Sequence, residues 1–220
     1  DLKPISKNFK EVLNNQLKIV KYPSIWILGL ASSTMYVTRY AINSWGILYL
    51  QEIRGFSLVE AGSIIGLNTF TGIIGCVAYG FISDKYFDAR RPPVTLMFGI
   101  VEIASLFLIF FGPDSTVVLT IAFLIYGFTL SGLLAVLGGL FAIDIAPKNI
   151  SGAAMGFIGL FSYIGAGLQE KISSLLIKTS TENDTSELLY NFDDAIIFWV
   201  FASIVSFILS LALWNKKTED

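Results

Sequence analysis

The sequence contains no histidine, a single cysteine and few charged residues for its length. Lys, Arg, Asp and Glu make up 15% of its 220 residues, whereas an ordinary soluble domain carries about 25%. Without histidine, and with Cys76 alone in an apolar run, neither a conventional zinc site nor a disulfide framework is available. The formal net charge is −2 and the basic residues are scattered, which excludes a nucleic-acid-binding face. We expect no metal, no cofactor and no nucleic-acid partner.

Catalytic motifs are missing as well. The sequence has no G-x-S-x-G, no Walker loop and no histidine to act as a general base, so it predicts neither an enzyme nor an ATP-driven pump. Its first residues lack the apolar core and cleavage site of a signal peptide. Because there is also no initiating methionine, we expect a fragment or a processed chain.

The abundant residues are apolar, at 54% of the chain, and they form six long runs. A helix that crosses a bilayer core of roughly 30 Å needs about 20 such residues. The runs are continuous instead of alternating, which favours helices over barrel strands, because lipid requires every backbone polar group to be satisfied internally. We predict an all-α membrane protein with six spans, at residues 24–50, 59–82, 93–112, 116–142, 150–177 and 195–214.

The segments outside these runs are polar. Residues 1–23 combine lysines with apolar residues at helical spacing, which predicts a short amphipathic segment at the membrane surface. Residues 178–194 have no apolar period and predict a solvated loop. Residues 215–220 form a short tail. Within the fifth run, residues 152–167 are rich in glycine and alanine, which predicts close packing against other helices.

The basic residues predict the orientation in the membrane. With six spans, both termini and the loops after the second and fourth spans lie on one side. Eleven Lys and Arg residues fall on that side, namely Lys3, Lys7, Lys10, Lys18, Lys21, Lys85, Arg90, Arg91, Lys148, Lys216 and Lys217. The other side has three, namely Arg54, Lys171 and Lys178. The positive-inside rule therefore predicts that both termini are cytoplasmic.

Arg39 lies near the middle of the first span, where a permanent cation costs at least about 2.5 kcal/mol on a lenient insertion scale. One interpretation is a structural cation paired with a carboxylate or with carbonyls of a neighbouring helix. The other is an anion site, because a guanidinium presents a planar fork of donors that matches phosphate or carboxylate. Tyr36 and Asn43 share its helix face by spacing and would line such a site.

Three more charges lie inside apolar runs. Glu102 in the third span has no partner evident in the sequence, so it could pair across helices or hold a proton. Glu170 in the fifth span could be a proton or counter-ion group, or could form an ordinary interfacial pair with the adjacent Lys171. Tyr163 lies seven residues before Glu170, so the two share a helix face.

The loop after the second span, residues 80–91, reads GFISDKYFDARR. It resembles the conformational loop motif of the major facilitator superfamily, in the variant of its organophosphate:phosphate antiporter branch. The general motif carries a glycine soon after the Asp-basic pair, whereas here Phe87 intervenes and the arginines lie further on. The resemblance assigns the motif to Gly80, Asp84, Lys85, Arg90 and Arg91.

Three further segments resemble the same branch, which includes the glycerol-3-phosphate and hexose-6-phosphate exchangers. They are YVTRY at 36–40, FLIYG at 123–127, and APK at 146–148 followed by GAA at 152–154 and GFIGLFSY at 156–163. The resemblance implies that the chain covers helices seven to twelve, and that Arg39, Tyr126 and Tyr163 face substrate. A second arginine would lie in the missing N-terminal six-helix half. In hexose-phosphate members an Asp and a Lys of the eleventh helix select substrate; here that region holds Gln169, Glu170 and Lys171.

From this resemblance we expect an inner-membrane antiporter that exchanges an organic phosphate for inorganic phosphate. Two alternatives stay open at the level of sequence. One is a proton-coupled facilitator for a sugar or an organic anion, with Glu102 or Glu170 as the proton carrier. The other is a membrane sensor of sugar phosphate, since one subgroup of the family resembles that and would keep the same ligand-facing residues.

Overall fold

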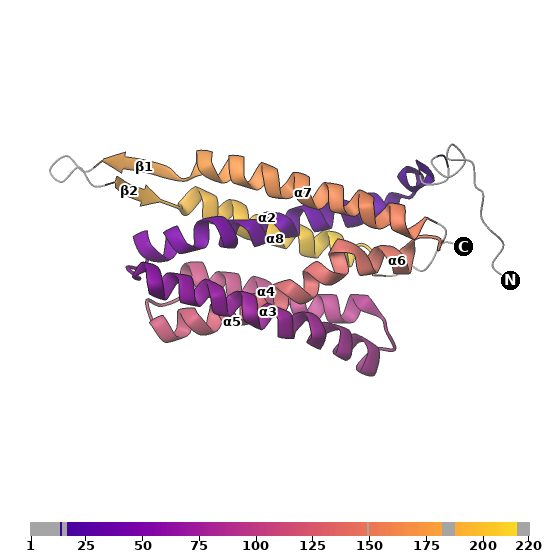
Figure 1. The fold of residues 1–220 in the computed structure, drawn as a ribbon, viewed down its shortest axis with the longest axis horizontal. Coiled ribbons are helices and arrows are strands. Elements are labelled where there is room, and N and C mark those ends of the chain that lie inside the picture. Colours follow the sequence, from indigo (N-terminus) through magenta and orange to yellow (C-terminus); the bar gives the residue numbers. More distant parts are fainter. Residues whose placement is uncertain (1–13, 15–16, 149, 182–187, 215–220) are drawn as a thin grey trace.

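A computed structural model describes residues 14, 17–148, 150–181 and 188–214. Of the amphipathic segment expected at residues 1–23, only residues 14 and 17–23 are described, and the tail expected at residues 215–220 lies outside the described residues. The described chain is helical apart from one hairpin, and its elements run in the order η1 (Lys18–Lys21), α2 (Pro23–Glu52), α3 (Leu58–Tyr86), α4 (Arg91–Phe111), α5 (Thr116–Ala135), η2 (Val136–Leu140), α6 (Phe141–Ile145), α7 (Ser151–Leu176), β1 (Lys178–Thr181), β2 (Leu188–Asn191) and α8 (Asp193–Leu211) (Figure 1).

Local signals account for where several helices begin and end. The hydroxyl of Ser57 accepts from the Glu60 amide while the Glu60 carboxylate accepts from the Ser57 amide, which is a capping box at the start of α3. A proline stands in the first turn of α2 and of α4, where its missing N–H costs nothing. After α2, Gly55 adopts φ +69°, a left-handed conformation that favours glycine.

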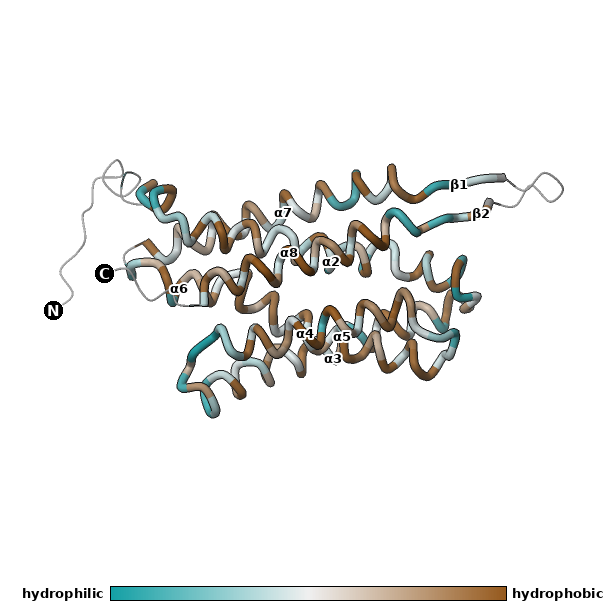
Figure 2. Tube along the Cα trace, turned by 180° about the vertical axis from the view of Figure 1, so that it is seen from behind, coloured by the Kyte–Doolittle hydropathy of each residue, from teal (hydrophilic) through white to brown (hydrophobic). Residues whose placement is uncertain are grey.

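Five stretches of helix are long and apolar enough to cross a membrane in the described part of the chain. They are α3, α4, α7, α8 and the continuous stretch from Thr116 to Ile145. Helix α2 has 30 residues, which span about 45 Å, but polar residues between Ser32 and Ser44 lower its mean hydropathy. Figure 2 shows hydrophilic residues gathered mainly at the two ends of the bundle. The all-α membrane fold is confirmed, and α2 as a sixth span stays a prediction.

The helices pack in two groups that meet lengthwise (Figure 1). Helix α2 packs mainly against α7 and α8, and α5 packs against α3 and α4. The fourth run is not one regular helix, because Gly139 leaves helical geometry and a π segment separates α5 from α6. Such segments recur at functional sites in helices. Short α6 then contacts α7 and α2, which links the two groups at one end.

Glycine lets α3 and α5 approach until their backbones touch. A Cβ atom added at Gly75 would lie 1.8 Å from the carbonyl oxygen of Phe128 on α5. In α7, by contrast, a Cβ atom at Gly152, Gly156, Gly159 or Gly167 would meet nothing within 4 Å, and Gly165 alone of its glycines closes on the carbonyl of Ser33. The predicted close packing of this helix is therefore found against α2, but four of its five glycines face outwards and take no part in it.

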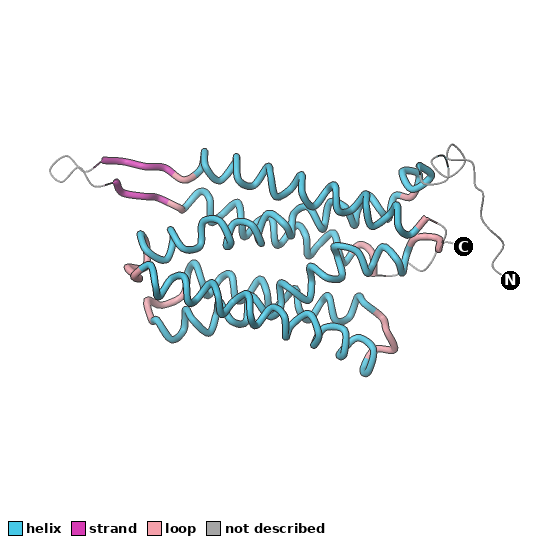
Figure 3. Tube along the Cα trace, in the orientation of Figure 1, coloured by secondary structure: helices cyan, strands magenta, loops and turns pink. Residues whose placement is uncertain are grey.

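The loop expected at residues 178–194 contains a hairpin. Strands β1 and β2 pair antiparallel, with Lys178 opposite Asn191 and Thr181 opposite Leu188 (Figure 3). Lys178 also donates to the Asp194 carboxylate at 2.6 Å, and this bond raises the pKa of Lys178. The sequence predicted a solvated loop here and missed the strands, because each has only four residues and neither KTST nor LLYN alternates between polar and apolar residues.

Candidate functional site

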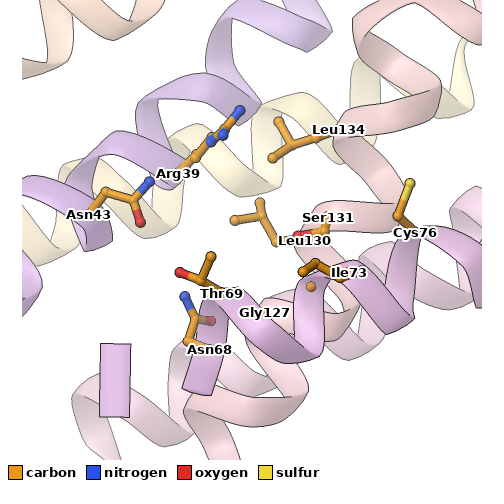
Figure 4. Close-up of a pocket in the computed structure, with 11 residues that line it drawn as sticks. Arg39, Asn43, Asn68, Thr69, Ile73, Cys76, Gly127, Leu130, Ser131 and Leu134 are labelled. Carbon is orange, nitrogen blue, oxygen red and sulfur yellow. The ribbon is translucent and has the colours of Figure 1, made fainter. Parts of the chain in front are cut away.

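A cavity of about 320 Å³ opens between α2, α3 and α5, half-way along the bundle. Arg39 and Asn43 of α2 form one side of it, and residues of α3 and α5 form the other, as Figure 4 shows. Its lining residues are Arg39, Asn43, Asn68, Thr69, Gly72, Ile73, Cys76, Gly127, Leu130, Ser131 and Leu134. The cavity is therefore a mostly neutral, partly polar space that contains one basic residue.

Arg39 is partly buried and has no hydrogen bond or ion pair among the residues that the structure describes. Its guanidinium carbon lies 5.5 Å from the ring centroid of Tyr36 and 5.7 Å from that of Tyr40. Cation–π contacts of this kind contribute about 0.5–1 kcal/mol each. They offset part of the cost of a cation in a span and leave the guanidinium donors unused. A ligand with a planar or tetrahedral anionic group could take these donors.

Two tyrosines and an amide that the sequence predicted for the site lie on or against the face of α2 that carries Arg39. The ring of Tyr163 on α7 meets that of Tyr36 edge to face, at 5.9 Å between centroids. Tyr163 is 66% exposed and Asn43 is also exposed, so both side chains lie on the open side of α2 and α7. Tyr36 therefore lies against the guanidinium, Asn43 lines the same cavity as Arg39, and Tyr163 contacts Tyr36. Their contact with a ligand stays a prediction.

Tyr126 lies elsewhere. Its side chain is fully buried, and its hydroxyl donates to the backbone carbonyl of Thr38 at 3.1 Å. The Thr38 hydroxyl in turn donates to the carbonyl of Trp199 on α8, at 3.3 Å. These bonds fix the α2 backbone at the residue before Arg39. In this conformation Tyr126 positions the helix that carries the cation and does not line the cavity; its contact with substrate stays a prediction.

Glu102 points into the bundle instead of the cavity. It is 0% exposed, one carboxylate oxygen accepts a hydrogen bond from the Ser203 hydroxyl of α8, and the other oxygen has no partner. No ion pair involves Glu102 within the described ranges. The sequence left open whether Glu102 pairs across helices or holds a proton. The structure shows a pairing across helices, as a hydrogen bond from the neutral Ser203 hydroxyl. Whether Glu102 holds a proton stays a prediction.

Gln169, Glu170 and Lys171 are consecutive on α7 and have three different surroundings, because a helix turns about 100° per residue. Gln169 is fully buried and donates to the Ser173 hydroxyl at 3.1 Å. Glu170 accepts a hydrogen bond from the Ser44 hydroxyl of α2. Lys171 is exposed, and no ion pair joins it to Glu170 in this part of the structure. The alternative of an interfacial Glu170–Lys171 pair is therefore not found, and none of the three lines the cavity.

The loop motif is organised around Arg91. Its guanidinium lies 3.1 Å from the Asp144 carboxylate of α6 and 3.5 Å from that of Asp84 on α3. The other expected members are more exposed: Lys85 lies over the Phe81 ring at 5.0 Å, and Arg90 precedes α4. A Cβ atom at Gly80 would meet nothing within 4 Å. Arg91 thus connects α3 to α6 at the end of the bundle that carries the α3–α4 loop (Figure 1).

Sequence reasoning missed the far side of the cavity. Asn68 of α3 is 5% exposed and lines the cavity, and its Oδ1 atom, which is buried against Gly127 of α5, has no hydrogen-bond partner. An asparagine inside an apolar run was a usable signal, because polar groups in spans are costly and usually face other protein or a cavity. Ser131 and Leu134 carried no such signal, since only the packing of α5 against α3 turns them inwards.

Comparison with known proteins connects this architecture to a family. Residues 2–169 match the model of the Major Facilitator Superfamily. The chain is 36% identical over 165 residues to the membrane sensor protein UhpC of Escherichia coli, covering 72% of this chain and 36% of that protein. It is 29% identical over 220 residues to the glycerol-3-phosphate transporter of Bacillus subtilis, covering 96% and 44%. With the hexose-6-phosphate:phosphate antiporter of E. coli it shares 30% over 159 residues, covering 66% and 31%.

These comparisons agree with the resemblance found in the loop and helix motifs. The chain spans less than half the length of these three relatives. These relatives are a membrane sensor protein and two transporters of phosphorylated compounds, and the family match covers the helix that carries Arg39. The chain is a multi-pass membrane protein of the major facilitator superfamily, in its organophosphate:phosphate antiporter family.

Proposed function

We propose that this chain is the C-terminal half of an inner-membrane antiporter that exchanges an organic phosphate for inorganic phosphate by alternating access. The observation that carries the proposal is the unpaired guanidinium of Arg39 beside an open cavity. A structural cation in a span pairs with a carboxylate or carbonyls. Arg39 has neither among the described residues, and its guanidinium lies over the rings of Tyr36 and Tyr40, which leaves its donors free for an anionic ligand.

The chemistry of the cavity favours a phosphorylated ligand over a bare sugar. Arg binds phosphoryl oxygens through two parallel N–H donors, and such charge-assisted bonds are about twice as strong as neutral ones. The other cavity-lining groups are neutral hydroxyls, amides and apolar side chains, which suit an organic portion. Relatives named as glycerol-3-phosphate and hexose-6-phosphate transporters support the same ligand class.

Alternating access requires a second helical unit on the other side of the substrate site. In transporters built from repeats, substrate lies near the bilayer midplane between two helical units that rock against each other. This chain supplies one of the two units, and on it the 66% exposed Tyr163 of α7 contacts the ring of Tyr36, which in turn lies against Arg39. We assign the other unit to an N-terminal six-helix half, which would add a second arginine to the phosphate site. The end with the α3–α4 loop and α6 would face the cytoplasm, because it carries most basic residues.

A sensor is the second candidate, since the match at 36% identity is to a membrane sensor protein. A sensor would bind the same ligand and keep the same cavity, but would transmit its occupancy to a partner instead of moving the ligand. Arg39 serves both functions equally, so flux and binding have to be measured separately.

The decisive experiment is counterflow of labelled inorganic phosphate in proteoliposomes that contain the full-length transporter. Glycerol 3-phosphate, glucose 6-phosphate and glucose are supplied in turn on the opposite side. We expect exchange with a phosphorylated compound, loss of exchange in Arg39→Ala and a strong reduction in Arg39→Lys. Lys178→Ala removes an exposed positive charge far from the cavity and serves as the control. Binding without exchange would favour the sensor, and transport of glucose would refute the phosphate site.

A further inference from the structure

A second cleft, of about 440 Å³, lies at the end of the bundle where the hairpin meets α8 (Figure 1). Its walls come from the ends of α2 and α4, from β2 and from the first turns of α8, whereas the Arg39 cavity lies between α2, α3 and α5. We call it the hairpin cleft. Its lining residues are Tyr49, Ile53, Arg54, Phe110, Phe111, Tyr190, Asn191, Phe192, Asp193, Ile196 and Ile197. Neither the sequence motifs nor the proposed exchange uses this cleft.

The hairpin cleft lies at the boundary between membrane and water. Helix α4 ends at Phe111 and helix α8 begins at Asp193, and both helices are long and apolar enough to cross a membrane. Phe111 and Ile197 are large, apolar and exposed on the outside of these helices, while Asn191 and Asp193 are exposed polar residues of the same lining. A molecule that fills the cleft therefore borders both lipid and water, so it has to be amphiphilic.

Aromatic rings form much of the wall. The ring of Tyr49 lies 5.3 Å from that of Phe110 and 5.7 Å from that of Phe192, and Phe192 lies 6.4 Å from Tyr190 between ring centroids. Many aromatic residues at membrane boundaries are simple anchors that face the headgroups. Tyr49 and Phe192 differ, because both are buried in the bundle and line the cleft. Aromatic ring faces attract ammonium groups, above all in places that are shielded from water.

Asp193 adds a negative charge to this lining. Its side chain accepts a hydrogen bond from the Asn191 amide at 3.0 Å, and no ion pair involves it in the part of the chain that the structure describes. The ammonium of Lys178, the cation of the hairpin, binds Asp194 instead, at 2.6 Å. One carboxylate at the cleft is thus left for a cation from outside the chain.

Arg54 adds a donor for a phosphate group. Its Nε bonds the Tyr49 hydroxyl, its Nη2 bonds the carbonyls of Ile109 and Phe110, and its Nη1 binds Asp114. These bonds use four of the five N–H groups of a guanidinium. One N–H of Nη1 is therefore unused within the described ranges, and a phosphodiester oxygen is a strong acceptor for it.

We propose that the hairpin cleft binds a phospholipid with an amine headgroup, of the phosphatidylethanolamine type. The ammonium lies against Asp193 and the aromatic wall, the phosphate accepts from Arg54, and the acyl chains follow Phe111 and Ile197. A small soluble amine would meet the carboxylate and leave the apolar lining uncovered, which favours a lipid. The inference rests on the membrane fold and does not depend on the ligand of the Arg39 cavity.

The test compares two lipids that share the phosphate and the acyl chains and differ in the amine. Full-length protein is purified in detergent, depleted of lipid, and titrated with phosphatidylethanolamine or phosphatidylglycerol, and bound lipid is counted by native mass spectrometry. Wild type should bind phosphatidylethanolamine about three- to tenfold more tightly, as expected for one partly exposed ion pair with a cation–π contact. Asp193→Asn keeps an acceptor for the Asn191 amide and should abolish this preference by weakening phosphatidylethanolamine alone.

Two further variants make the result specific. Glu60→Gln removes another exposed acid from the first turn of a helix, α3, and keeps a residue that fits its capping box, so it should retain the wild-type preference. Asp193→Lys should reverse the preference towards phosphatidylglycerol, because the amine would then meet a cation. Thermal unfolding without lipid checks that each variant is folded. Equal affinity of wild type for the two lipids, or an unchanged preference in Asp193→Asn, would overturn the site.

Discussion

Replacing Arg39 by glutamine should leave the free energy of unfolding unchanged or raise it, whereas replacing Arg54 by glutamine should lower it. Both substitutions remove one positive charge and keep a side chain of similar reach. The two arginines differ in their surroundings. Arg39 lies over two tyrosine rings and has no hydrogen bond within the described residues. Arg54 donates to the carbonyls of Ile109 and Phe110 at 3.0 and 3.1 Å and to the Tyr49 hydroxyl at 3.1 Å.

The magnitude for Arg54 follows from these bonds. The carbonyls of Ile109 and Phe110 belong to the last turn of α4, where no backbone donor remains and the helix dipole is negative. Hydrogen bonds from a charged donor contribute about 1.5–3 kcal/mol each, although such contributions overlap. The ion pair with Asp114 adds at most about 1 kcal/mol, because the Asp114 side chain is 86% exposed. Arg54→Gln should therefore cost about 2–4 kcal/mol.

For Arg39 the two contributions nearly cancel. A cation inside a span costs at least about 2.5 kcal/mol, and two cation–π contacts return about 1–2 kcal/mol. Arg39→Gln should thus raise the free energy of unfolding by about 0.5–1.5 kcal/mol. The same variant should lose the stabilisation by ligand that wild type shows, which is about 2.7 kcal/mol at a ligand concentration 100 times the Kd.

Unfolding of the full-length protein in mixed micelles, followed by tryptophan fluorescence with and without glucose 6-phosphate, measures both effects. If Arg39→Gln destabilises the protein as much as Arg54→Gln does, Arg39 is a structural cation. The argument for a ligand at its guanidinium would then fail.

Two further predictions concern the packing around the site. Gly75→Ala should destabilise the protein by about 1–3 kcal/mol, because the new methyl group would collide with the Phe128 carbonyl. In the control Gly80→Ala the methyl group meets open space, so this variant should gain up to about 1 kcal/mol of stability from helix propensity. Equal effects of the two substitutions in thermal unfolding would contradict the α3–α5 contact. Tyr126→Phe should lose about 1 kcal/mol of stability and raise the half-saturating phosphate concentration less than about threefold, since its hydroxyl bonds Thr38. A much larger loss of affinity at unchanged stability would show direct contact with substrate.

The local structure of the chain could be predicted from the sequence because lipid leaves few choices. A continuous apolar run in a membrane has to satisfy its backbone polar groups within itself, so each run becomes a helix. Helix periodicity then places Tyr36, Arg39 and Asn43 on one face without any knowledge of their neighbours. The hairpin after α7 was missed, because its two strands have only four residues each and show no alternation of polar and apolar residues.

Which face of each helix looks inwards was decided only by tertiary structure. Tyr126 and Tyr163 are both tyrosines in apolar runs, yet Tyr126 is 0% exposed and Tyr163 is 66% exposed. In a membrane, hydrophobicity cannot distinguish a helix face that meets lipid from one that meets protein, since both surroundings are apolar. The choice depends on shape, such as the missing side chain of Gly127 that brings α5 against Asn68. The sequence by itself therefore determined the helices and the cation at their midpoint. The packing of α3 on α5 decided which residues lie across the cavity from that cation.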